Sequence, residues 1–228
     1  MLWDIDGTLV DTAGHGRNAF MQAFEAVLGR PPMLDDVPMA GRTDYAICLD
    51  LLERNDVEEP EALVHRMFAE LHTALLERRE LMAAQGGPQP GVRQALTHLG
   101  ARQDVLQSLL TGNIEPNAEV KLGVFGLHSL VDLEIGGYGC DRVTRSDLVG
   151  VARRKARAKH GVDVSAADTV LVGDTPLDVD AAHAAGARVV AVATGPYTAE
   201  ELAQSGPDAV LQDVSDIGAL LAVLGLPE

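Results

Sequence analysis

The sequence predicts an α/β protein, in which a parallel sheet is covered by helices and a helical module is inserted near the N-terminus. Two observations indicate this class. From residue 90 onward, short apolar runs alternate with stretches of helical periodicity. Residues 13–86 lack strand-like runs and show helical spacing only, although residues 1–5 already resemble a buried strand.

The predicted strands are apolar runs that end in polar or glycine-rich turns. Continuous valine-rich runs are typical of strands buried on both faces. The predicted strands are 1–5, 104–112, 131–137, 168–174, 187–195 and a weaker 208–213. The predicted helices between them are 91–99, 115–124, 146–160, 178–185 and 214–224. Such alternation implies right-handed crossovers and a Rossmann-like parallel sheet.

The inserted module is predicted to hold helices only. Apolar residues recur at helical spacing in 15–29, 44–55 and 60–81, and Pro and Gly make 30–38 and 86–91 connecting segments. We therefore expect an α/β core of residues 1–12 and 87–228, with residues 13–86 forming a helical cap.

The charge of the chain excludes some partners. Its 228 residues carry a formal net charge of −16, which opposes binding to nucleic acid or to anionic membranes. The same charge repels anionic substrates at long range. A phosphate site would therefore need local positive charge and backbone N–H groups.

The expected location is the cytoplasm. Cys48 and Cys140 fit no metal-ligand spacing and are expected to be reduced thiols. A secretory leader is not visible at the N-terminus, and apolar runs stay short of the roughly 20 residues that span a bilayer.

Polar residues follow several predicted strands at their carboxyl ends, where open α/β sheets bind ligands. They are Asp4, Asp6, Thr111, Asn113, Asp174 and Asp178. Because strand side chains alternate, Asp4 and Asp6 point to the same face. Close carboxylates repel unless a cation lies among them, and oxygen ligands suit Mg²⁺.

The same edge is predicted to bind an anion and to transfer a phosphoryl group. The Thr111 hydroxyl and the amides of Gly112 and Asn113 lie where a helix begins, which favours phosphate. One aspartate can attack phosphorus, and a second can handle the proton.

Three segments resemble motifs of the haloacid dehalogenase superfamily. "DIDGTLVDT", "LLTGN" and "VGDTPLDVDAAHAAG" are similar to its first, second and fourth motifs, in order and over nearly the whole chain. The helical insert also matches the position of a small cap in this family. The branch that it resembles most contains phosphoglycolate phosphatase and β-phosphoglucomutase.

The resemblance implies a role for each matching residue. Asp4 is implied as the nucleophile, and Asp6 as the general acid and base with its backbone carbonyl on Mg²⁺. Thr111 is implied as a phosphate ligand, Asp174 as a Mg²⁺ ligand, and Asp178 as the carboxylate that supports the metal site. An acid at Asp6 favours phosphate esters, because their alkoxide leaving group needs a proton.

The chain departs from the family at the third motif, which usually supplies a lysine, commonly before a proline. The stretch "CDRVTRSDLVGVARRKA" has no Lys-Pro, and Arg145 occupies the expected place. An arginine can neutralise the same charge and bind phosphate oxygens bidentately. Lys121 and Lys155 are the alternatives.

Substrate selection is predicted to involve the segment 40–46, where Gly41 permits close backbone approach and Arg42 could contact a substrate anion. A solvated role for Arg42 is the alternative. The prediction is a Mg²⁺-dependent phosphatase acting on a small phosphorylated metabolite, such as phosphoglycolate or a sugar phosphate. The alternatives are a phosphomutase and a binding protein without turnover. The sequence leaves the oligomeric state open.

Overall fold

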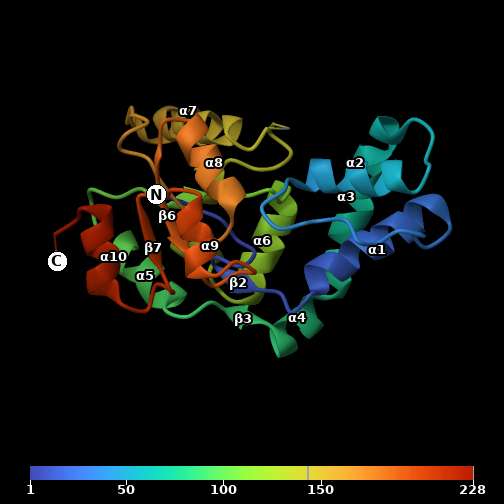
Figure 1. Cartoon of the computed structure of the whole chain (residues 1–228), viewed down its shortest axis with the longest axis horizontal. Coiled ribbons are helices and arrows are strands. Elements are labelled where there is room, and N and C mark those ends of the chain that lie inside the picture. The colour runs from blue at the N-terminus through green and yellow to red at the C-terminus, as the bar shows by residue number, and fades with distance from the viewer. Residues whose placement is uncertain (143, 228) are drawn as a thin grey trace.

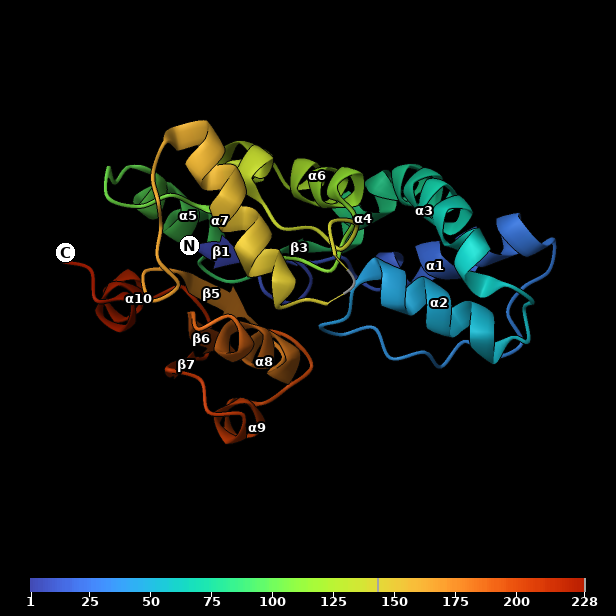
Figure 2. The ribbon, with the colours of Figure 1, turned by 90° about the horizontal axis from the view of Figure 1, so that it is seen from above.

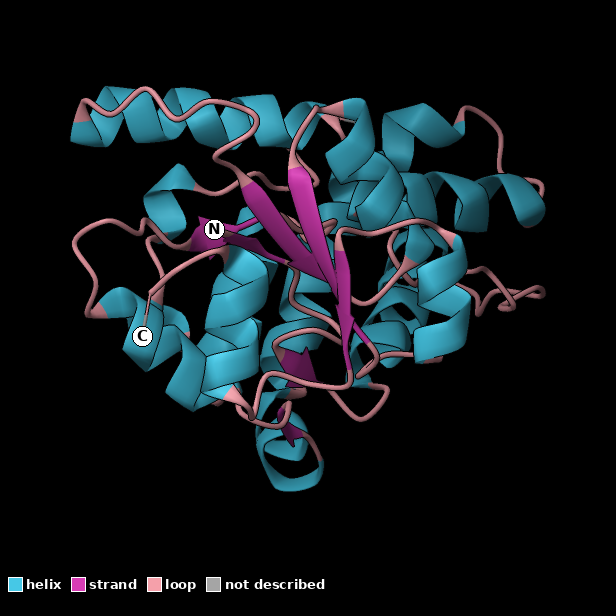
Figure 3. Ribbon diagram, turned by 60° about the vertical axis from the view of Figure 1, so that its left-hand side comes forward, coloured by secondary structure: helices cyan, strands magenta, loops and turns pink. Residues whose placement is uncertain are grey.

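A computed structural model describes residues 1–142 and 144–227 and confirms the predicted α/β class. Its centre is a five-stranded sheet in the order β4-β1-β5-β6-β7, and every pairing is parallel (Figures 1 and 3). The strands are β1 (Leu2–Trp3), β4 (Ser108–Leu109), β5 (Val170–Gly173), β6 (Arg188–Val192) and β7 (Ala209–Leu211).

The register places β1 between β4 and β5. Leu2 pairs with Ser108 on one side and with Leu171 on the other. Because the three strands run in the same direction, the residues that follow them meet at one edge of the sheet. The chain therefore brings together segments more than 100 residues apart.

Helices cover both faces of the sheet, as the valine-rich strands predict. Along β6, Val190 and Val192 belong to one hydrophobic cluster, whereas Val189 and Ala191 belong to another. The first cluster includes residues of α5 (Val92–Gly100), α6 (Glu115–Val124) and α10 (Ile217–Leu224). The second includes residues of α7 (Asp147–His160), α8 (Pro176–Ala184) and α9 (Ala199–Gln204).

A helical module lies at one end of the molecule, away from β6 and β7 (Figures 1 and 2). It contains α1 (His15–Leu28), α2 (Asp44–Arg54), α3 (Pro60–Glu77) and α4 (Arg79–Gln85). These helices bury a hydrophobic cluster of their own, which includes Phe24 and Met67. The antiparallel strands β2 (Val10–Asp11) and β3 (Gly87–Pro88) pair where the chain enters and leaves the module.

Helix α6 packs against both parts of the molecule. Ala118 and Leu122 lie in the cluster of the sheet, whereas Val120 and Val124 pack against the cluster of the helical module. A shift of the module relative to the sheet would therefore act on α6, which begins directly after the predicted phosphate-binding residues.

The structure contradicts one predicted strand. Residues 131–137 do not form a strand, because the chain makes the 3-10 turns η1 (His128–Leu130) and η2 (Leu133–Ile135). The Asp132 carboxylate accepts a hydrogen bond from the Glu134 amide at 3.1 Å, which starts the second turn. Only Gly137 within this segment makes a bridge to the sheet, with Leu110.

One helix boundary differs from the prediction, and one further helix was not predicted. The expected helix over 60–81 divides at Arg78 into α3 and α4. Helix α9 was not predicted, although the capping box of Thr198 and Glu201 at its start is a sequence signal for it. Among the described residues, no helix is long and apolar enough to cross a membrane.

The side chain of Asn55 holds the connection between α1 and α2. It is fully buried, accepts hydrogen bonds from the amides of Met33 and Leu34, and donates to the carbonyls of Leu34 and Leu51. Removing it would take a partner from the buried Leu51 carbonyl and from three partly buried backbone groups of Met33 and Leu34.

Replacing Asn55 by Ala is therefore expected to lower the free energy of unfolding by about 2 kcal/mol or more. Urea denaturation measures this loss. Asn18→Ala, on the exposed side of α1, is the matched control and should change stability by less than about 0.5 kcal/mol. Equal stability of the two variants would contradict the anchoring role of Asn55.

Candidate active site

The segments that follow β1, β4 and β5 meet at one edge of the sheet, because these strands are parallel neighbours. Asp4 follows β1, Thr111 follows β4, and Asp174 follows β5. All three residues are buried, and the Asp4 amide donates to the Val172 carbonyl at 2.9 Å. Backbone pairing with β5 thus continues one residue beyond the end of β1 and fixes Asp4 beside β5.

An acidic cluster forms at this edge. Asp4, Asp174 and Asp178 each offer a carboxylate oxygen, and these oxygens lie within 4.8 Å of one another. Burial, together with the neighbouring carboxylates, raises the pKa of Asp4 to about 6 and that of Asp174 to about 8. Positive charge is therefore needed for these groups to be ionised together at neutral pH.

The carboxylate of Asp174 is closely surrounded by Thr8, Gly7 and Gly195. The Thr8 hydroxyl donates to its Oδ1 at 2.8 Å. A Cβ atom would lie 2.3 Å from its Oδ2 if placed on Gly7, and 1.8 Å if placed on Gly195. Glycines at these two positions allow the backbone to approach the carboxylate and hold its orientation.

These residues fit a Mg²⁺ ion. The donor set consists of carboxylate oxygens, which a hard cation prefers, and two of the acids have pKa values that positive charge would lower. Asp4, Asp174 and Asp178 would supply side-chain oxygens. The Asp6 carboxylate lies outside this cluster, so only its backbone carbonyl remains for the metal role that the resemblance implies.

Arg145 lies beside the acidic cluster. Its guanidinium is 3.0 Å from Asp4 Oδ2 and 2.5 Å from Asp178 Oδ1, and it also donates to the Gly41 carbonyl at 3.2 Å. The two carboxylates raise the pKa of Arg145 above its usual range, although burial acts against this. The structure thus places this arginine where a third-motif cation is expected.

Lys121 provides a second cation on the other side of the site. Its Nζ lies 2.6 and 2.7 Å from the two carboxylate oxygens of Asp6 and 2.7 Å from Asn113 Oδ1. The Asn113 amide also donates to Asp6 at 2.8 Å. Lys155, the other alternative, instead binds Asp141 and the Gly136 carbonyl.

The predicted phosphate-binding residues form the turn between β4 and α6. Thr111 is fully buried, and its hydroxyl oxygen accepts a hydrogen bond from the Asn113 side-chain amide at 2.8 Å. Gly112 contacts the helical module: a Cβ placed there would lie 2.0 Å from the Arg42 carbonyl oxygen. A larger residue would therefore push the module away from this loop.

The segment 40–46, which is predicted to select the substrate, lies against the core at Gly41. Gly41 has a φ of +70°, and a Cβ there would lie 2.4 Å from the Thr175 hydroxyl. Arg42, however, points back into the module, where it pairs with Asp50 at 2.7 Å and with the Pro38 carbonyl. A contact between Arg42 and substrate would require this pair to break.

A cavity of about 320 Å³ adjoins the site. It lies between the segment 41–46 and the core residues around Arg145, Leu177 and Asp180. Its volume suits a small organic molecule. Arg145 lines this cavity and also contacts Asp4, whereas Asp4, Asp174 and Asp178 are not among its lining residues.

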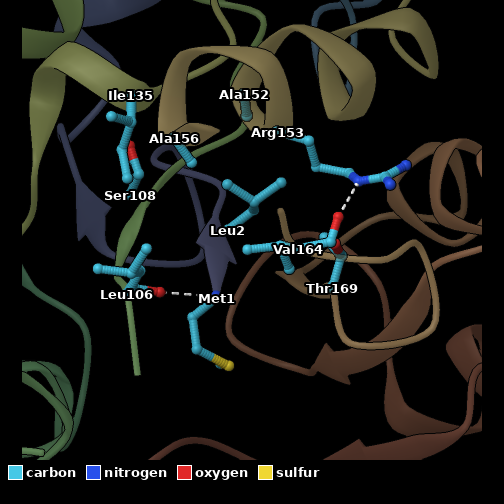
Figure 4. A pocket seen from close by; sticks show the side chains of 10 residues that line it. All are labelled: Met1, Leu2, Leu106, Ser108, Ile135, Ala152, Arg153, Ala156, Val164 and Thr169. Atoms are coloured by element: carbon cyan, nitrogen blue, oxygen red, sulfur yellow. Dashed lines mark hydrogen bonds between the residues drawn. The ribbon is translucent and has the colours of Figure 1, made fainter. Parts of the chain in front are cut away.

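Another cavity lies at the opposite edge of the sheet, beneath the start of β1 (Figure 4). It measures about 40 Å³ and is lined mainly by apolar side chains such as Leu2, Ile135 and Ala156. The Met1 amine donates to the Leu106 carbonyl at 2.8 Å, and Arg153 donates to Val164. This cavity contains none of the predicted site residues.

Sequence reasoning missed some polar residues around the site. Thr8 lies within the first motif, and Thr175 lies within the fourth, where its hydroxyl donates to Asp178 at 2.7 Å. Asp44 had no motif signal, but it is buried against the predicted phosphate-binding turn. The role of Asp44 becomes visible only in the folded structure, where it contacts Ile114 from a distant part of the chain.

Comparison with known proteins agrees with this geometry. Residues 1–183 match the haloacid dehalogenase-like hydrolase family. A plasmid-encoded phosphoglycolate phosphatase of Cupriavidus necator is 30% identical over 229 residues, which cover 97% of this chain and 92% of the relative.

Solved structures share the fold over nearly the full length. CbbY from Rhodobacter sphaeroides, determined in complex with phosphate, has a TM-score of 0.71 at 21% identity, with 99% of this chain and 98% of CbbY covered. A Bacteroides vulgatus structure described as a β-phosphoglucomutase homologue has a TM-score of 0.67 at 17% identity, with 98% and 87% covered.

The resemblance predicted from the three motifs is therefore confirmed, and the phosphatase relatives support a hydrolase acting on phosphate esters. The chain belongs to the haloacid dehalogenase-like hydrolase family.

Proposed function

We propose that this protein is a Mg²⁺-dependent phosphatase that hydrolyses a small organic phosphate monoester through an aspartyl-phosphate on Asp4. The observation that carries this proposal is the different surroundings of two neighbouring carboxylates. Asp4 is buried beside Arg145, Asp174 and Asp178, whereas the Asp6 side chain is 44% exposed and is held by Lys121 and Asn113. Carboxylates in such different environments can take different roles.

In the first half of the reaction, an Asp4 carboxylate oxygen attacks phosphorus. The bond between phosphorus and the ester oxygen breaks, and the leaving alkoxide takes a proton from Asp6. Arg145 stabilises the negative charge on Asp4 and on the phosphate oxygens. The Thr111 hydroxyl and the amides of the turn after β4 orient the phosphate.

In the second half, Asp6 accepts a proton from water as the water oxygen attacks phosphorus. The bond between phosphorus and Asp4 breaks, which releases inorganic phosphate and regenerates the carboxylate. Lys121 and Asn113 fix the orientation of Asp6 during these steps. Bound Mg²⁺ would supply positive charge among Asp4, Asp174 and Asp178.

The substrate we propose is a small phosphorylated metabolite. The cavity between the segment 41–46 and the core accommodates a molecule of this size, and the sequence relatives include a phosphoglycolate phosphatase. Residues 13–86 would act as a cap over a core of residues 1–12 and 87–228. Gly41 would lie near the organic part of the substrate, and Arg42 would reach it after its pair with Asp50 breaks.

Asp4→Asn is expected to reduce phosphate release from p-nitrophenyl phosphate by about 10³-fold or more, because an amide is a poor nucleophile. EDTA should abolish the activity of the unaltered protein, and added Mg²⁺ should restore it. The exposed Asp163→Asn is the control. Phosphate release that persists in Asp4→Asn would contradict the proposal, and a panel of small organophosphates would rank the substrates.

The raised pKa values of Asp4 and Asp174 predict how Mg²⁺ affects stability. Between about pH 4 and pH 8, these two carboxyl groups hold more protons in the folded state than in the unfolded state. In metal-free protein, their contribution to the free energy of unfolding therefore falls as the pH rises through this range. Mg²⁺ must displace these protons. Its stabilising effect on the melting temperature should therefore be larger at pH 8 than at pH 6.

Asp174→Asn should remove most of this Mg²⁺ effect at both pH values. A melting temperature that responds to Mg²⁺ equally at pH 6 and pH 8, or an unchanged response in Asp174→Asn, would show that the ion binds elsewhere.

Arg145→Ala is expected to lower kcat/KM by about 100-fold or more, because it removes a buried cation beside the nucleophile. Arg145→Lys keeps the charge but not the planar fork, so its kcat/KM should lie between those of the alanine variant and the unaltered protein. Lys155→Ala, which removes a cation away from Asp4, is the control. Unchanged kinetics of Arg145→Ala would refute its assigned role.

A further inference from the structure

Asp44 is buried at the junction between the helical module and the phosphate-binding turn. It is the first residue of α2, and only 4% of its surface is exposed. Its backbone amide donates to the Gly112 carbonyl at 2.7 Å, and its carboxylate Oδ2 accepts the Ile114 amide at 2.9 Å. Asp44 therefore binds both sides of the turn through two different groups.

The second of these bonds completes the start of α6. The N-cap residue of α6 is Ile114, whose side chain cannot accept a hydrogen bond. The first amides of a helix need acceptors. Asp44 supplies one of them from 70 residues away along the chain.

Two glycines allow the segment 42–44 to approach the turn this closely. A Cβ on Gly112 would lie 2.0 Å from the Arg42 carbonyl oxygen and 2.9 Å from Thr43 Cα. A Cβ on Gly139 would lie 1.9 Å from the Gly112 carbonyl oxygen, which is the acceptor for Asp44. Glycine at both positions therefore permits the close contact between the segment 42–44 and the turn.

The module holds α6 at a second residue, one turn further along the helix. His72 of α3 contacts the Asn117 side chain, with 3.0 Å between Nδ1 and Oδ1. Asn117 is itself buried in the first turn of α6. Two helices of the module thus meet the first turn of α6.

The two hydrogen bonds of Asp44 use its backbone amide as a donor and one side-chain oxygen as an acceptor. Burial raises the pKa of this carboxyl to about 7, with a contribution from Asp6 and against the opposing effect of Lys121 and the Ile114 amide. A neutral acceptor of the same shape should therefore replace the carboxylate.

We propose that Asp44 is a positioning residue that couples docking of the helical module to the shape of the phosphate-binding turn. When α2 lies against the core, Asp44 holds the Ile114 amide and the Gly112 carbonyl, and so orders residues 111–114 for an anion. When α2 moves away, α6 loses its N-terminal acceptor and the turn loosens. The inference deepens the proposed function, because it rests on that turn binding phosphate.

The test compares Asp44→Ala and Asp44→Asn with Glu53→Ala, which removes an exposed acid from the same helix. Hydrogen exchange is measured by mass spectrometry on ligand-free protein, over peptides spanning residues 110–118. Binding of inorganic phosphate in the presence of Mg²⁺ is measured by calorimetry. Asp44→Ala should speed exchange in these peptides and weaken phosphate binding by about tenfold each.

Asp44→Asn keeps an oxygen acceptor and should stay within about threefold of the unaltered protein in both measurements, as should Glu53→Ala. If Asp44→Ala does not fold, Asp44→Ser gives the same prediction, since its shorter side chain does not reach Ile114. Asp44→Leu separates this role from space filling, because leucine keeps a similar volume without an acceptor and should therefore behave like Asp44→Ala.

Unchanged exchange over residues 110–118 in Asp44→Ala would overturn the proposal, and so would an Asp44→Asn variant as impaired as Asp44→Ala. The exchange measurement needs no ligand, so it tests the contact even if the protein is not a phosphatase. Failure of the unaltered protein to release phosphate from p-nitrophenyl phosphate would instead refute the proposed function.

Discussion

Crowding of carboxylates at the carboxyl edge of the sheet is the constraint on which the site depends. Asp4, Asp174 and Asp178 are buried within a few ångströms of one another in a chain whose net charge is already −16. Carboxylates in such an arrangement can be ionised together at neutral pH only with positive charge close by. Arg145 supplies part of this charge within the cluster, while Lys121 balances the neighbouring Asp6.

Each of the two cations binds a different acid, so the same edge of the sheet can hold both a nucleophile and a proton carrier. Arg145 binds the buried acid proposed to attack phosphorus, and Lys121 binds the more exposed acid proposed to carry the proton. The two cations come from different helical regions, Lys121 from α6 and Arg145 from the residues just before α7. Movement of α6 would therefore affect the proton-carrying acid more than the nucleophile.

Much of the fold and most of the site were predictable from local patterns. Valine-rich runs predict strands buried on both faces, and acids after the strands predict a shared edge, because parallel strands align their carboxyl ends. Local patterns failed where a side chain competes with the backbone, as at Asp132, which turns an apolar run into 3-10 helix. They also could not reveal Asp44, because its partners lie 70 residues away and meet it only in the folded protein.

The double packing of α6 has a consequence for engineering. A graft that exchanges only residues 13–86 for the module of a relative would leave Val120, Val124 and Phe125 facing a foreign surface. It would also separate Ile114 from its acceptor at Asp44. A chimera with altered substrate range therefore needs α6 to travel with the module, so the exchangeable unit is discontinuous in sequence.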